Sequence, residues 1–105
     1  MDIVETPIFT RQVIELLTDD SYHELQIELI RNPDLGDEIV GSGGLRKIRW
    51  SLQGRGKRGG VRIIYYWFMS KDRLLMLYMY SKNKQDNLTM EQLKMLRQVV
   101  EKEYR

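Results

Sequence analysis

The strongest constraint on the fold is a run of three extended segments, residues 45–52, 61–69 and 73–81. Apolar and polar residues alternate in the first, and the other two are dense in β-branched and aromatic side chains, as strands are. Because short links join the three segments, we expect an antiparallel meander. In the third segment, simple alternation predicts a common side for four residues, Leu74, Met76, Tyr78 and Tyr80.

Two helices are predicted before the meander. Thr6 followed by Pro7 is typical of a helix start, since Thr can cap the first turn and Pro fits the first helical position. The spacing of Ser21 and Glu24 predicts a capping box for the second helix. The pair Asn32–Pro33 should end that helix, because a residue before proline disfavours the helical region.

One more helix is predicted after the meander, where Thr89 and Gln92 have capping-box spacing and the apolar pattern continues to near Tyr104. Residues 2–5 add a short extended opening. We therefore expect a single α+β domain over residues 1–105, with the order β-α-α-β-β-β-α. Its twisted antiparallel sheet should carry the helices on one face and leave the other face open.

Positive charge is concentrated in the meander. Residues 39–71 contain eight Lys or Arg and no Asp or Glu, although the whole chain is only +2, so the remainder carries −6. Lys47 and Arg49 alternate with apolar residues and should point away from the core, as should Arg62 on the next strand. These cations could simply be solvated. Their concentration favours a face that binds a polyanion.

The loop over residues 53–60 has the spacing G-x-G-x-x-G. In a dinucleotide-binding fold a helix begins at the last glycine, whereas a strand follows here, so that interpretation is rejected. The remaining interpretations are a flexible hairpin loop and a basic arm that grips phosphates. The second is favoured because three cations repel one another unless an anion is near: Arg55, Lys57 and Arg58.

Several kinds of site are not expected from this composition. The chain has no cysteine and one histidine, His23, in an acidic helix, which argues against disulfides, thiolate metal sites and a catalytic triad. Asp72 and Asp86 are the only acids over residues 39–86, so we predict neither metal-dependent chemistry nor a cofactor. No apolar run could span a bilayer and no signal peptide is visible, which predicts a cytoplasmic protein without membrane contact.

Three stretches, in this order, are shared with a known family: Gly43–Arg49, Gly56–Tyr66 and Tyr80–Asn83. The chain resembles the RelE/HigB toxins, and its second stretch is most similar to the HigB branch. This resemblance implies the toxin of a type II toxin–antitoxin system, a ribosome-dependent, metal-free endoribonuclease that cuts mRNA in the ribosomal A site and blocks translation. The implied partners are a helix-turn-helix antitoxin, the ribosome with mRNA, and operator DNA only through the antitoxin complex.

The resemblance also implies roles for single residues. The family's lysine on the first meander strand matches Lys47, its arginine after the glycines matches Arg62, and its C-terminal basic position falls at Lys82 or Asn83. Some relatives carry a tyrosine near the start of the last helix; here either Tyr80 takes that place, where a base could stack, or the role is absent. RNA contacts are expected from six further cations: Arg46, Arg49, Arg55, Lys57, Arg58 and Lys84.

These residue types imply a mechanism in which the RNA 2′-hydroxyl attacks the adjacent phosphorus. Lys47 or Lys82 would take the proton, and Arg62 would stabilise the charge that builds on the phosphoryl oxygens. Two other functions could use the same face. A non-catalytic module would bind RNA or the ribosome without cutting, whereas an interaction protein would dock an acidic partner and have no affinity for nucleic acid.

Overall fold

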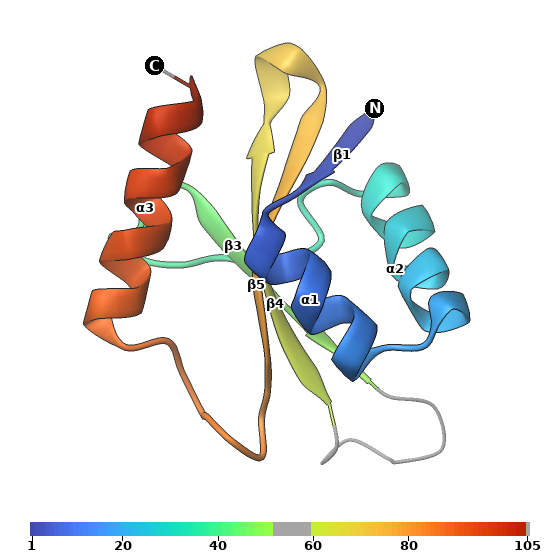
Figure 1. The fold of residues 1–105 in the computed structure, drawn as a ribbon. Coiled ribbons are helices and arrows are strands. Elements are labelled where there is room, and N and C mark those ends of the chain that lie inside the picture. The colour runs from blue at the N-terminus through green and yellow to red at the C-terminus, as the bar shows by residue number, and fades with distance from the viewer. Residues whose placement is uncertain (52–59, 105) are drawn as a thin grey trace.

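A computed structural model of the chain describes residues 1–51 and 60–104, which form one five-stranded sheet and three α-helices (Figure 1). The strands are β1 (Asp2–Glu5), β2 (Asp37–Glu38), β3 (Leu45–Trp50), β4 (Val61–Phe68) and β5 (Arg73–Ser81). The helices are α1 (Pro7–Leu16), α2 (Asp19–Arg31) and α3 (Met90–Tyr104), and the 3₁₀ turn η2 (Met69–Lys71) joins β4 to β5. The α+β class and the predicted element order are confirmed, with β2 and η2 added. None of the described helices is both long and apolar enough to cross a membrane.

The sheet has the strand order β1-β5-β4-β3-β2. β3, β4 and β5 are antiparallel neighbours, which confirms the meander. The prediction of a wholly antiparallel sheet was wrong, because β1 pairs in parallel with β5. A tight turn forces antiparallel pairing, but β1 is separated from β5 in the chain by two helices and the strands β2, β3 and β4, so either direction is open to it.

Helices cover both faces of the sheet, with α1 and α2 on one side and α3 on the other (Figure 1). Phe9 of α1 packs in the cluster that contains Ile63, whereas Leu96 and Val100 of α3 pack in the cluster that contains Ile64. The prediction that all helices share one face was therefore wrong. β4 carries apolar side chains on both of its faces, and each face needs a cover to keep them out of water.

A register shift between β4 and β5 changes which side chains of β5 face α3. Ile64 pairs with Tyr78, whereas the next residue, Tyr65, pairs with Met76, so Leu77 is an extra residue in β5. As a result, Tyr78 no longer shares a face with Met76. The alternation predicted for β5 was wrong beyond this bulge.

The helix starts agree only in part with the predicted caps. Thr6 caps α1 as expected, since its Oγ1 accepts from the Phe9 N–H at 3.1 Å. α2 begins earlier than predicted, because Thr18 accepts from the Ser21 N–H at 3.1 Å. Ser21 is therefore inside the helix, where its Oγ accepts from Nε1 of Trp50 at 3.0 Å.

Thr18→Ala should lower the free energy of unfolding by about 1 kcal/mol, because an N–H of the first turn loses its acceptor. Thr18→Ser keeps a hydroxyl in place and should cost less than about 0.5 kcal/mol. Urea unfolding of the two variants beside the parent protein measures the difference. Equal stability of the two variants would show that Thr18 is not the cap.

Candidate functional site

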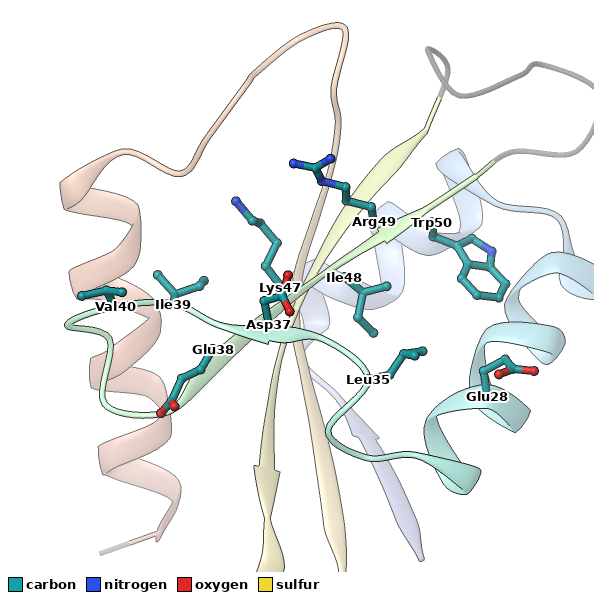
Figure 2. Close-up of a pocket in the computed structure, with 10 residues that line it drawn as sticks. All are labelled: Glu28, Leu35, Asp37, Glu38, Ile39, Val40, Lys47, Ile48, Arg49 and Trp50. Atoms are coloured by element: carbon teal, nitrogen blue, oxygen red, sulfur yellow. The ribbon is translucent and has the colours of Figure 1, made fainter.

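The register of β3, β4 and β5 brings the predicted cations to one face of the sheet. Arg49 pairs with Arg62, and Arg62 pairs with Tyr80, so these three side chains form one row across three strands. Lys47 lies two residues along β3 and shares the parity of Arg49. Figure 2 shows Lys47 and Arg49 projecting to the same side of β3, while the apolar residues between and beside them project to the other. The common direction predicted for Lys47, Arg49 and Arg62 is confirmed.

Helix α3 covers only part of this face. Its apolar residues pack in a cluster with Leu45 and Ile64, whereas Lys47 is half-buried and Arg49 is exposed. In Figure 2 both cations extend toward the segment that joins β5 to α3, residues 82–89, and not under the body of the helix. The face predicted to be open is thus accessible at Lys47 and Arg49, whereas Arg62 and Tyr80 on the same face are buried. We refer to the three cations Lys47, Arg49 and Arg62, together with Tyr80 beside Arg62, as the cationic row.

Arg62 is the buried cation of this row, with 6% of its surface exposed. Its Nη1 donates to the carbonyl of Val61 at 3.4 Å. Within residues 1–51 and 60–104 no carboxylate lies within ion-pair distance of it, and residues 52–59 contain no Asp or Glu. A buried charge without a counter-ion is costly, so this position favours an incoming anion.

Tyr80 lies beside Arg62 and is also buried, with 5% of its surface exposed. Its hydroxyl has no hydrogen-bond partner within the described residues. Burial raises the pKa of Tyr80 above its ordinary value, and the Arg62 charge opposes this to a smaller extent. The hydroxyl therefore stays protonated and can donate to an anion. The expectation that a base stacks on Tyr80 is corrected, because the ring is covered.

The segment after β5 brings other cations to the same end of the sheet. The backbone N–H of Lys82 donates to the carbonyl of Gly60 at 3.2 Å, which places Lys82 close to the start of β4. Lys82, Asn83 and Lys84 are all exposed. The same segment also contacts β3, since Nζ of Lys47 donates to Oδ1 of Asn87 at 3.5 Å.

Arg46 is not part of the cationic row. It pairs with Tyr65 on the face covered by α1 and α2, and its Nη1 donates to the carbonyl of Gly36 at 2.7 Å. Tyr65 supports the same connector, since its hydroxyl accepts from the Gly36 N–H at 2.9 Å and donates to the Pro33 carbonyl at 2.6 Å. The expected RNA contact of Arg46 is therefore corrected: its charge holds the chain segment before β3.

An acidic border beside the cationic row was not predicted. β2 pairs Asp37 with Lys47 and Glu38 with Arg46. Both acids line a groove of about 750 Å³ along the β3 edge, together with Glu28, Lys47 and Arg49 (Figure 2). Two residues are too short for a periodic signal, so this pairing could not be read from the sequence.

Three predicted RNA-binding cations, Arg55, Lys57 and Arg58, lie outside the described residues. His23 is exposed on α2. In the described part of the chain, His, Asp and Glu side chains form no group of three or more that could hold a metal ion.

Comparison with protein families shows which family the chain belongs to. A family model described as the RelE toxin of the RelE/RelB toxin–antitoxin system matches residues 6–104. The chain belongs to the RelE toxin family. This confirms the family that the sequence resembles, while the HigB-like branch stays a prediction.

The solved structures support the same fold. The structure of the E. coli toxin RelE, an arginine double mutant in the free state, matches this RelE-family chain with a TM-score of 0.59. The match covers 81% of this chain and 86% of that chain at 13% sequence identity. Identity this low shows a shared fold and assigns no role to the residues of the cationic row.

Proposed function

We propose that this RelE-family chain is a ribosome-dependent endoribonuclease that cuts mRNA in the ribosomal A site without a metal ion. The observation that carries the proposal is Arg62, a buried guanidinium without a carboxylate partner in the described residues, in one row with Arg49. Such a cation stabilises a phosphate most when negative charge builds on its oxygens during attack. The protein would act in the cytoplasm and be neutralised by a helix-turn-helix antitoxin, reaching operator DNA only through that complex.

The proposed reaction uses the RNA's own nucleophile. The 2′-oxygen attacks the adjacent phosphorus, the bond to the 5′-oxygen breaks, and the products are a 2′,3′-cyclic phosphate and a free 5′-hydroxyl. The amine of Lys47 or Lys82 takes the 2′ proton, and the departing 5′-oxygen takes a proton from water. Arg62 and the Tyr80 hydroxyl face the phosphoryl oxygens, where charge increases.

A message with one altered nucleotide tests this mechanism. Ribosomes are programmed with a defined mRNA, and a second mRNA carries a single 2′-deoxy nucleotide at the cut site. We expect the first to be cut to a cyclic phosphate end and the second to be bound but left intact, because it lacks the nucleophile. Equal cutting of both messages would contradict the mechanism. Binding without any cutting would support the non-catalytic RNA-binding module instead.

Arg46 and Arg49 offer a matched pair of variants, because both lie on β3 but on opposite faces of the sheet. Arg49→Ala should raise the KM for programmed ribosomes about tenfold, since an exposed phosphate contact is lost, and should leave the melting temperature unchanged. Arg46→Ala should lower the free energy of unfolding by about 1.5–3 kcal/mol, because the charged hydrogen bond to Gly36 is lost. Cleavage kinetics and thermal unfolding of both variants measure the two effects.

The two readouts serve as controls for each other. Arg46→Ala should change the KM by less than about twofold, which corresponds to a contact worth less than about 0.5 kcal/mol. An Arg46 variant with the larger effect on KM would show that the cationic row is not the RNA-binding face.

A further inference from the structure

Gln92, in the first turn of α3, connects three separate parts of the chain. Its Oε1 accepts from the Thr89 N–H at 3.0 Å and from Nε2 of Gln85 at 2.5 Å. Its Nε2 donates to the hydroxyl oxygen of Tyr78 at 3.4 Å. One side chain therefore joins the helix start, the segment after β5 and β5 itself.

The orientation of both amides follows from their backbone partners. A backbone N–H can only donate, so the atom of Gln92 that meets Thr89 is the oxygen, and its nitrogen turns toward Tyr78. A backbone carbonyl can only accept, so the atom of Gln85 that meets the Asn87 carbonyl at 2.7 Å is the nitrogen. The same Gln85 nitrogen donates to Gln92, and no other assignment satisfies all four contacts.

This network extends to the cationic row. Gln85 holds the Asn87 backbone, and the Asn87 side chain accepts from Nζ of Lys47 at 3.5 Å. A lysine ammonium sits on a flexible stem and takes a defined position only where a partner fixes it. Because Asn87 is that partner and is exposed to solvent, its own position depends on the bonds that reach it from Gln92 through Gln85.

We propose that Gln92 is a positioning residue of the ribonuclease site, acting through Asn87 on Nζ of Lys47. This inference rests on the proposed function, because Lys47 matters only if it handles a proton or a phosphate. Helix capping alone would need the Thr89 contact, whereas the bond from Gln85 to Gln92 and the bond from Gln85 to the Asn87 carbonyl hold the segment that faces the row. A displacement of about 1 Å at a reacting group can lower a rate about 10²-fold.

Cleavage by the full-length protein on programmed ribosomes tests the inference. Gln92→Ala should lower kcat about tenfold to a hundredfold and change KM less than twofold, because the exposed cations that bind the ribosome are unaltered. Gln92→Glu should keep kcat within about threefold of the parent, since a carboxylate accepts both bonds that Oε1 accepts. Asn87→Ala combined with Gln92→Ala should be no slower than Asn87→Ala alone.

Three results would overturn the inference: a Gln92→Ala variant with unchanged kcat, a Gln92→Glu variant as slow as Gln92→Ala, or losses that multiply in the double variant. Absence of cleavage by the parent protein would overturn the proposed function instead. In that case amide hydrogen exchange still tests the network in the free protein. We expect the Thr89 amide to exchange at least tenfold faster in Gln92→Ala, and an unchanged rate would show that Gln92 does not hold the segment.

Discussion

Arg62→Ala should lower the rate of mRNA cleavage on ribosomes by about 10²–10³-fold, the loss typical of removing one group that stabilises charge in the transition state. The expectation follows from the position of Arg62, which is buried and has no carboxylate partner in the described residues. Its charge is therefore available to a phosphate. Single-turnover cleavage of a defined mRNA in programmed ribosomes measures the loss.

Two further variants serve as controls for the Arg62→Ala result. Arg62→Lys keeps the charge but not the planar fork, so its rate should fall between those of Arg62→Ala and the parent protein. Arg11→Ala removes an exposed charge from α1, across the sheet from the cationic row, and should leave the rate within about twofold. Arg62→Ala should also stay folded, since removal of a buried unpaired charge relieves its desolvation cost. A folded Arg62→Ala variant that cuts at more than a third of the parent rate would contradict the proposed role of Arg62 in stabilising the transition state.

The protein should lose stability steeply above pH 10. Burial raises the pKa of three tyrosines above their ordinary value, and for Tyr22 the hydrogen bond to Glu5, 2.6 Å long, acts in the same direction. The other two are Tyr65 and Tyr80. Above the unfolded pKa of about 10 the unfolded chain releases these protons while the folded chain keeps them, so rising pH favours unfolding.

Each tyrosine that stays protonated in the folded chain while it ionises in the unfolded chain adds up to about 1.4 kcal/mol per pH unit to the slope of this stability loss, and its contribution ends where the folded group begins to ionise. Urea unfolding between pH 8 and pH 11 measures it. Tyr22→Phe and Tyr80→Phe should each make the slope less steep, and comparison with the parent cancels the titration of other groups. Identical slopes in all three proteins would contradict the assignment of the effect to these tyrosines.

Local pattern was enough to predict most of the elements. Residues Arg73–Ser81 form β5 as predicted, and the caps at Thr6 and Thr89 involve only neighbours within three residues. Ser21 was predicted as a cap from its spacing to Glu24, and this was wrong because Thr18, three residues upstream, is the cap and accepts from the Ser21 N–H. β2 was missed since two residues carry no periodicity and its strand character comes from β3.

Alternation along single strands predicted the shared face of Lys47, Arg49 and Arg62, because side-chain direction within a strand is a local property of the backbone. The remaining features of the site depend on contacts between distant residues. Pairing with β4 creates the bulge at Leu77 that turns Tyr80 toward Arg62, and α3 crosses to the second face because β4 is apolar on both. Burial of a cation and the approach of Asn87 to Lys47 follow from that packing, which no run of neighbouring residues encodes.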